Sequence, residues 1–283
     1  MESHTPIIIF NFLAASGFAL LLATLFPALL SSRIHRSKAW FSMIFSWIIY
    51  ALSYLLIIGH QLGPEPPRGI CVYQMVLIYA CPPLTAMSGL AFIIDVHFRV
   101  TGALFTSQVD HRYTQSLLLV PWASFVAVAS GALIAVQDFA DVSRNSHHMY
   151  CHSTTSVQYL TTALICVFAL FVALCMITWT ATILYRNWAL FRRLSVKQND
   201  LRLSSLIRVA IFSMMTSIGL GLGAFSAFRG NATEGDAIWG ALLPILPFLC
   251  AIAFGTQRDI VRCWMFRKPR TEGADASMST PHV

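Results

Sequence analysis

The sequence predicts an all-α membrane protein: a seven-transmembrane helix bundle with the N-terminus outside and a short interfacial helix after the seventh span. Three observations predict this class. Apolar residues form 57% of the 283 residues and charged residues 11%, whereas soluble domains average roughly 45–50% and roughly 25%. Seven apolar runs are long enough to span a bilayer, and the Lys and Arg residues gather at one set of their ends. Lipid is therefore the expected solvent for most of the chain.

The seven apolar runs each hold about the 20 residues that cross roughly 30 Å of hydrocarbon. They are residues 7–31, 39–59, 70–98, 116–136, 157–185, 204–228 and 237–256. We expect helices, because a helix satisfies its own backbone in lipid and no run alternates polar and apolar residues like a barrel strand. Residues 1–268 are then one membrane domain, and the polar segment 269–283 is a disordered cytoplasmic tail.

The distribution of basic residues predicts which way the bundle faces. Of the 19 Lys and Arg residues, 15 lie in the gaps after runs one, three, five and seven, and Arg208 lies just inside the sixth run on the same side; the opposite side carries only Arg68, Arg144 and Arg229. Short cytoplasmic loops are enriched in Lys and Arg. We therefore expect the N-terminus outside and the C-terminus in the cytosol. The same asymmetry explains the net charge of +7, so membrane lipid is an expected partner and nucleic acid is not.

Two cysteines lie on the side predicted to face outside. Cys71 begins the third run, and Cys151 lies in the loop before the fifth run. Outside the cell the environment is oxidising, so we expect a disulfide between these two residues; the alternative is a pair of free thiols.

The outer side also carries a glycosylation sequon and a group of histidines. Asn231 begins an Asn-Ala-Thr tripeptide, which is an acceptor sequence for glycosylation. The histidines His147, His148 and His152 surround Cys151, and they suggest either a solvated loop or a metal site. The solvated loop is favoured, because no carboxylate or further Cys stands at a metal-ligand spacing. No metal is expected.

Asp95 is the acid expected at the inner end of the third helix. It follows Cys71 by 24 residues, which is about 36 Å of helix and one membrane crossing. An acid at this depth is expected to pair with a cation, and Arg208 in the sixth run or Arg99 on the same helix are the candidates. The alternative is a carboxylate that is solvated at the membrane interface.

Two further segments are expected on the inner face. Residues 185–193 extend the fifth helix with basic and aromatic side chains, which suit anionic lipid or a cytoplasmic partner. Gly255 ends the seventh span, and residues 257–267 form a short amphipathic helix in the membrane interface. Cys263 in this helix is a candidate for palmitoylation, and an unmodified thiol is the alternative.

The residues that are missing from the spans argue against an enzyme. The lysines are Lys38, Lys197 and Lys268, and none lies within a span, which excludes a retinal Schiff base. No span holds the histidine pair of a haem site or the ligands for zinc hydrolysis. No cofactor is therefore expected. A transporter is also disfavoured, because the spans lack mid-membrane ionisable residues and an internal repeat.

Taken together, these features resemble a G-protein-coupled receptor. The spacing from Cys71 to Asp95 is similar to that from the disulfide cysteine to the acid of the Asp-Arg-Tyr motif in rhodopsin-like receptors. His97 stands in place of the tyrosine and Val96 in place of the arginine. The sixth run lacks Cys-Trp-x-Pro, and the seventh lacks Asn-Pro-x-x-Tyr. The resemblance implies the receptor architecture more firmly than the rhodopsin-like activation mechanism.

Local strings resemble an orphan family of seven-helix, receptor-like proteins of mushroom-forming fungi, over about residues 7–268. These strings are Met149-Tyr150-Cys151, Tyr185-Arg186-Asn187-Trp188 with Phe191-Arg192-Arg193, Ile207-Arg208-Val209 and Phe254-Gly255-Thr256-Gln257-Arg258-Asp259. The chain is also distantly similar to fungal lipopeptide-pheromone receptors, whose seventh helix likewise ends in a Phe-Gly step.

The resemblance implies a fungal plasma-membrane receptor that senses an extracellular ligand and signals to the α subunit of a heterotrimeric G protein. By depth in the bundle, the candidate ligand-binding residues are Gln74, Tyr79, Phe225 and Trp239. Asp95 and Arg208 would form an ionic lock. The residues expected to face the G protein are Arg99, Arg186, Arg192 and Arg193. The alternative is a seven-helix scaffold, chaperone or transporter without G-protein coupling, which the missing arginine of the Asp-Arg-Tyr motif favours.

Overall fold

The protein is a bundle of long helices with one small β-hairpin. The computed structural model describes residues 5–31, 34, 36–105, 111–136, 142–145, 147–153, 156–190, 207, 208, 210–212 and 243–265. The elements are α1 (Thr5–Leu30), α2 (Lys38–Leu55), α3 (Arg68–Phe105), α4 (His111–Ala135), β1 (Val142–Arg144), β2 (Cys151–Ser153), α5 (Ser156–Arg186), α9 (Ile245–Gly255) and α10 (Arg258–Trp264).

Four of the described helices are long and apolar enough to cross a membrane, which is compatible with a multi-pass membrane protein. They are α1, α3, the part of α4 from Gln115, and the part of α5 from Val157. The helix α2 has 18 residues and several serines and aromatic residues, and it is not among the four. The first five apolar runs are therefore confirmed as helices. Of the sixth run the structure describes five residues, which are helical, and α9 covers the second half of the seventh.

Local sequence signals explain where α2 and α9 begin or end. The Ser37 hydroxyl accepts a hydrogen bond from Trp40 N at 3.2 Å, which caps the first turn of α2. Between α2 and α3, Gly59 and Gly63 adopt φ values of 89° and 88°, a left-handed backbone that glycine reaches without strain. The helix α9 ends at Gly255, as expected, and α10 begins one turn later.

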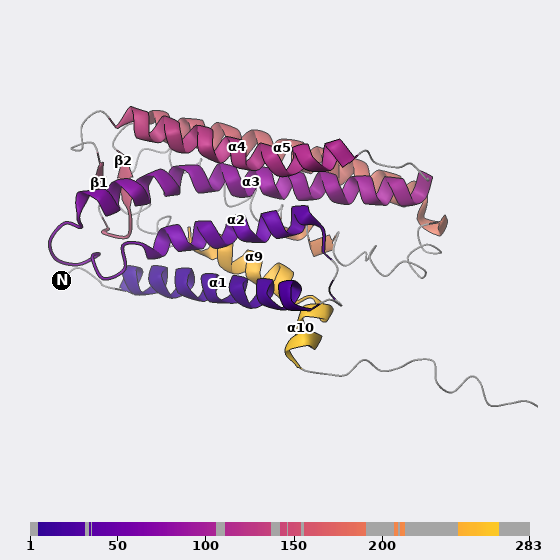
Figure 1. The fold of residues 1–283 in the computed structure, drawn as a ribbon, viewed down its shortest axis with the longest axis horizontal. Helices are drawn as coiled ribbons and strands as arrows, with labels where there is room; N and C mark the ends of the chain where they lie inside the picture. Colours follow the sequence, from indigo (N-terminus) through magenta and orange to yellow (C-terminus); the bar gives the residue numbers. More distant parts are fainter. Residues whose placement is uncertain are drawn as a thin grey trace, which may run out of the picture.

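The helices form two sides around a central α3 (Figure 1). Helices α4 and α5 lie on one side of α3, and α2, α9 and α1 lie on the other. The β-hairpin lies at the end of the bundle where α1 and α3 begin, which we call the hairpin end. Helix α10 lies at the opposite end, which we call the α10 end (Figure 1).

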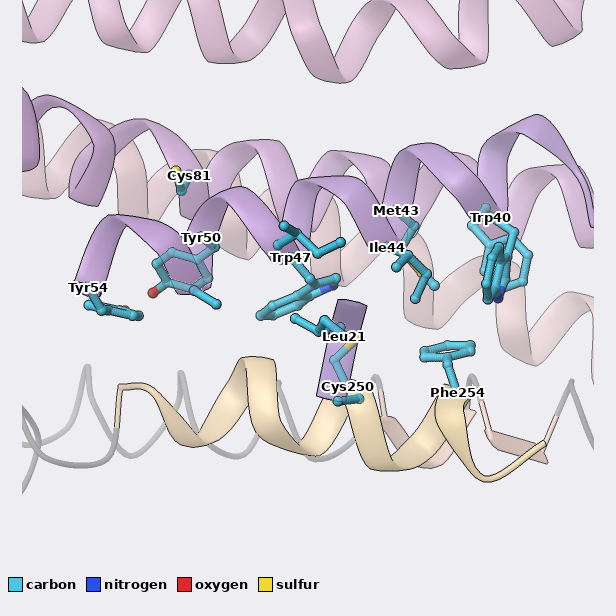
Figure 2. Close-up of a cluster of buried hydrophobic side chains, with 14 of the residues drawn as sticks. Leu21, Trp40, Met43, Ile44, Trp47, Tyr50, Tyr54, Cys81, Cys250 and Phe254 are labelled. Atoms are coloured by element: carbon cyan, nitrogen blue, oxygen red, sulfur yellow. The ribbon is translucent and has the colours of Figure 1, made fainter. Parts of the chain in front are cut away.

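The main core lies between α2 and α9 (Figure 2). One face of α2 buries large side chains at spacings of three or four residues, as an amphipathic helix does: Trp40, Met43, Ile44, Trp47, Tyr50 and Tyr54. Cys250 and Phe254 of α9 and Leu21 of α1 meet this face. Burial of these side chains fixes α2 between its neighbours.

Helices α1 and α9 approach each other closely at two glycines. A Cβ atom added at Gly17 would lie 3.1 Å from the backbone N of Phe248, and one added at Gly255 would lie 2.6 Å from Thr24 Oγ1. A larger residue at either position would separate the helices. Small residues that permit such contact are typical of helix pairs in membranes.

Candidate functional site

The expected disulfide is present at the hairpin end. Cys71, in the first turn of α3, bonds to Cys151 in β2, with 5.4 Å between their Cα atoms. Both cysteines are buried, and Ile57 packs against them. The bond links positions 80 residues apart in the sequence, so it ties the hairpin directly to the start of α3.

The hairpin itself is closed by a single asparagine. Strands β1 and β2 pair antiparallel, with Arg144 opposite Cys151. Asn145 Oδ1 accepts a hydrogen bond from Met149 N at 2.7 Å, and Asn145 N donates to Tyr150 O at 2.9 Å. His148 takes a left-handed φ of 57° within this turn. An Asn side chain that satisfies backbone groups in this way is typical of tight turns.

Gln74 holds the hairpin from inside the bundle. Its Nε2 donates to Ser53 O at 3.0 Å, and its Oε1 accepts from Cys151 N at 3.0 Å. The side chain is fully buried. Both ends of the amide are therefore engaged with protein, and a role for Gln74 in ligand binding stays a prediction.

The other ligand-binding candidates divide between buried and undescribed residues. Tyr79 is 8% exposed and packs against Met75, Val76 and Ala132, so it belongs to a core cluster between α3 and α4. Phe225 and Trp239 lie outside the described residues, as does the sequon residue Asn231.

Arg144 and Gln61 fasten the loop between α2 and α3 to the hairpin. The Arg144 guanidinium donates to the carbonyls of His60, Gln61 and Gly63 at 3.0–3.2 Å. Gln61 exchanges two hydrogen bonds with Asn11 of α1, at 2.6 and 2.9 Å, and also donates to a hairpin carbonyl. The hairpin end thus joins α1, α2, α3 and the hairpin in one network.

Asp95 lies near the α10 end and pairs within its own helix. Its carboxylate accepts from Arg99 Nε at 3.0 Å, one turn along α3, and the Arg99 side chain is 55% exposed. Of the two cations considered from the sequence, Arg99 is therefore the partner. The Asp95–Arg208 pair that was expected as an ionic lock is not formed in this structure, in which the guanidinium of Arg208 binds Ala253 and Thr256 instead.

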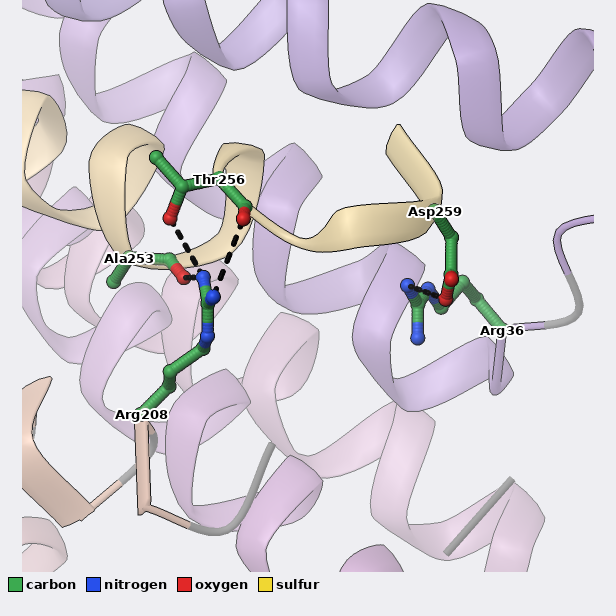
Figure 3. A network of polar contacts seen from close by, with 5 residues as sticks. All are labelled: Arg36, Arg208, Ala253, Thr256 and Asp259. Atoms are coloured by element: carbon green, nitrogen blue, oxygen red, sulfur yellow. Dashed lines mark hydrogen bonds and ion pairs between the residues drawn. The ribbon is translucent and has the colours of Figure 1, made fainter. Parts of the chain in front are cut away.

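Arg208 binds the last turn of α9 (Figure 3). Its Nη1 donates to Ala253 O at 2.8 Å and to Thr256 Oγ1 at 2.6 Å, and its Nη2 donates to Thr256 O at 3.2 Å. A helix leaves its last carbonyls without partners inside the helix, and they attract cations. The guanidinium of Arg208 is therefore bound by three oxygen acceptors at the end of α9.

A second polar contact crosses from α3 to α5. His97 Nδ1 lies 2.8 Å from Thr180 Oγ1, and the Thr180 hydroxyl itself donates to Met176 O at 2.7 Å. The Thr180 hydroxyl therefore lies between the His97 ring and the carbonyl of Met176. Near the same end, Arg186 in the last turn of α5 is exposed. Arg192 and Arg193 lie outside the described residues.

Helix α10 turns away from α9 and docks on α1 and the start of α2. Arg36 pairs with Asp259 at 3.5 Å (Figure 3), and its guanidinium also lies over the ring of Trp40. Trp264 Nε1 donates to Ala23 O of α1 at 3.0 Å. A helix is thus present over Arg258–Trp264, where an interfacial helix at about 257–267 was expected, and Cys263 is half-buried on it.

The sequence did not predict several of these contacts. Gln61 lies in a loop and Arg144 ends the short strand β1, and no sequence spacing links either residue to its partners. The pairing of His97 with Thr180 depends on how α3 and α5 are placed side by side. A polar residue inside an apolar run, such as Thr180, is the one signal that could have drawn attention to that contact.

Among the residues that the structure describes, no group of three His, Cys, Asp or Glu side chains is placed to hold a metal. No protein-family model matches the chain, and no curated protein matches it. A proposal for the function therefore depends on the contacts at the hairpin end and at the α10 end.

Proposed function

We propose that the protein is a G-protein-coupled-receptor-like membrane receptor with seven spans and the N-terminus outside. In the proposed orientation, the hairpin end faces the exterior and the α10 end faces the cytosol. The single observation that carries the proposal is the layout of α3. A disulfide to the following loop lies in its first turn, and the Asp95–Arg99 pair lies one membrane crossing away on the same helix.

The different contacts at the two ends of the bundle support a different role for each end. At the hairpin end, the disulfide, Gln74 and Arg144 place a folded loop over α1, α2 and α3. At the α10 end, exposed arginines such as Arg99 and Arg186 present positive charge near a docked amphipathic helix. A receptor needs a structured outer surface for its ligand and a charged inner surface for its transducer.

In this proposal the protein resides in the plasma membrane and signals to the α subunit of a heterotrimeric G protein. Ligand binding would bias the packing of the third, fifth and sixth spans, and Arg192 and Arg193 would add positive charge on the side that faces the G protein. Asn231 would be glycosylated and Cys263 palmitoylated. An apolar bundle of this kind is compatible with a lipopeptide, a lipid or a small volatile ligand.

Co-purification with a G protein tests the coupling. The full chain is expressed in yeast whose own pheromone receptor has been deleted, and it is purified in mild detergent with its bound partners. A receptor is expected to retain the heterotrimer and to release it when a non-hydrolysable GTP analogue is added. Association that is insensitive to nucleotide would instead support a scaffold or chaperone.

Orientation is tested separately with epitope tags at each end of the chain. The proposal expects an N-terminal tag to bind antibody on intact cells and a tag after Val283 to bind only after permeabilisation. The reverse pattern would overturn the receptor proposal, because the arginines of the α10 end would then face outside.

A further inference from the structure

Prolines inside α1 and α3 leave backbone carbonyls without their usual helical partners. In an α-helix each N–H donates to the carbonyl four residues earlier, and proline has no N–H. Pro27 therefore frees the carbonyl of Ala23 in α1. In α3, Pro83 frees the carbonyl of Tyr79 in the same way. Both helices are long and apolar enough to span a membrane, so each freed carbonyl needs a donor from elsewhere, because an unpaired carbonyl is costly in lipid.

Trp264 of α10 donates to the carbonyl that Pro27 frees. Its Nε1 lies 3.0 Å from Ala23 O, and the bond joins residues 241 positions apart in the sequence. An indole N–H can only donate, so the direction of this bond is certain. Helix α10 lies against α1 near the end of that helix (Figure 1). The carbonyl that binds α10 is thus one that α1 cannot use for its own hydrogen bonding.

Thr162 of α5 donates to the carbonyl that Pro83 frees, with 2.9 Å between Thr162 Oγ1 and Tyr79 O. The other threonines of α5 donate to the carbonyl four residues earlier in their own helix, as hydroxyls in helices commonly do. They are Thr161, Thr178, Thr180 and Thr182. Within α5 as the structure describes it, Thr162 is the one threonine whose hydroxyl donates to a carbonyl of another helix, and it does so where a proline has freed the acceptor.

We propose that Pro27 and Pro83 each create a docking carbonyl, which we define as a backbone carbonyl that a proline frees and a side chain of another element binds. Trp264 fixes α10 on α1 through one docking carbonyl, and Thr162 fixes α5 on α3 through the other. In each pair the proline is a positioning residue, because it acts by removing the competing N–H. The proposal does not depend on coupling to a G protein.

A docking carbonyl lets the bound element leave without damage to the helix that offers it. Release of Trp264 breaks no hydrogen bond inside α1, because Pro27 supplies no N–H to Ala23 O. The ion pair of Arg36 with Asp259 also holds α10, but it spans 3.5 Å and both side chains are partly exposed, so its contribution is small. Helix α10 is therefore a strap that depends on Trp264 and can detach while α1 keeps its structure.

Hydrogen exchange of the full chain in lipid nanodiscs, followed by mass spectrometry, tests the α10 pair. Trp264→Phe keeps an aromatic ring but removes the donor, and exchange of the α10 amides is expected to rise about tenfold while α1 exchanges as in wild type. Pro27→Ala restores an N–H that can donate to Ala23 O. Trp264→Phe made in that background should therefore raise exchange less than about threefold. Trp179→Phe, at an exposed position of α5, is the control and should change nothing in α10.

The α5 pair is tested in the same way with a closer control. Thr162→Val removes the hydroxyl and keeps the shape of the side chain, and exchange in the first three turns of α5 is expected to rise about fivefold. The rise should fall below about twofold in the Pro83→Ala background. It should persist in the Pro82→Ala background, because Pro82 frees a different carbonyl. Thr161→Val removes a hydroxyl that bonds its own helix and should leave exchange there near the wild-type rate.

The comparison with and without the proline separates docking from a general loss of stability. The proposal requires both pairs to show an effect that depends on the proline of that pair. An equal rise in exchange in the proline and alanine backgrounds would overturn it, as would an unchanged rate in Trp264→Phe or Thr162→Val. If a variant of one pair does not fold, the other pair decides the matter by the same comparison.

Discussion

The hairpin end and the α10 end are held together in different ways. At the hairpin end, one covalent bond and a dense set of buried hydrogen bonds join α1, α2, α3 and the loop before α5. At the α10 end, most of the described polar contacts are made by single side chains without a covalent bond, and some of these side chains are exposed: Asp95 with Arg99, His97 with Thr180, Arg36 with Asp259, Trp264 with Ala23 and Arg208 with α9.

This difference teaches where the molecule can change shape at low cost. Breaking the hairpin end would leave buried donors and acceptors without partners, which is expensive in a low-dielectric interior. At the α10 end, Arg99 is exposed and Arg208 is half-buried, so water can replace a lost partner of these side chains and the cost is smaller, although Asp95 and Thr180 are themselves buried. A rigid hairpin end and an adjustable α10 end are therefore built into the chemistry of the contacts.

Loss of the disulfide is expected to have the largest effect. Replacing Cys71 and Cys151 with Ala should lower the free energy of unfolding by about 4 kcal/mol, because the unfolded chain regains the entropy of a long loop. Thermal unfolding in detergent is the measurement. Cys175→Ala is the control, since Cys175 is a free, exposed cysteine of α5, and it should leave the midpoint unchanged. A double variant as stable as wild type would show that the disulfide does not make the hairpin end more stable than the α10 end.

Gln74→Leu is expected to have the next largest effect. The change leaves Cys151 N and Ser53 O buried without partners, which costs roughly 2–3 kcal/mol of stability. Hydrogen exchange at the hairpin should rise at the same time, because the hairpin loses its bond from inside the bundle. Tyr73→Leu, at an exposed position next to it on α3, serves as the control. Equal destabilisation by both variants would show that Gln74 has no special role.

Arg144→Gln should have a smaller effect, about 1–2 kcal/mol, because its three acceptors lie near the surface and water can replace the guanidinium. Limited proteolysis of the loop at 59–63 is expected to become faster in this variant. Arg68→Gln removes an exposed arginine at the same end and should not change the cleavage rate. An unaltered rate in Arg144→Gln would mean that this loop is held without Arg144.

Asp95→Asn should have the smallest effect, less than about 0.5 kcal/mol, since the pair with Arg99 is intrahelical and its arginine is exposed. Stability is measured by thermal unfolding, and basal signalling is measured in the yeast strain described above. Because Asp95 does not hold Arg208, we expect unchanged signalling with normal surface expression. A loss above 2 kcal/mol would show that the α10 end is as tightly fixed as the hairpin end.

Elements with a strong local signal could be predicted well from the sequence. The first five apolar runs agree with α1 to α5 to within a few residues at most ends, because a long apolar run in lipid has only helix available. Gly255 as the end of α9 and the amphipathic α10 after it follow from local residue chemistry. The Cys71–Cys151 bond followed from the compartment that the two residues share.

Partner choice among polar side chains could not be predicted in the same way. Asp95 had two cations within reach by sequence, and the nearer one along the helix is its partner. Gln74 was expected to meet a ligand by depth alone, yet the amide fits between Ser53 and the backbone of Cys151. Depth in a membrane is a property of position along a helix, whereas rotation toward a neighbour depends on how all the helices pack.

The amino-acid sequence by itself determined the helical class, the lengths of the long helices and the residues of the disulfide. Each of these depends on chemistry that is local or shared by a whole compartment. Only the tertiary structure decided that Arg208 reaches α9, that Gln74 supports the hairpin and that His97 meets Thr180. Each of these contacts depends on the free energies of alternative partners that the fold brings together from distant segments. The partner that forms is the one that satisfies most buried polar groups at once.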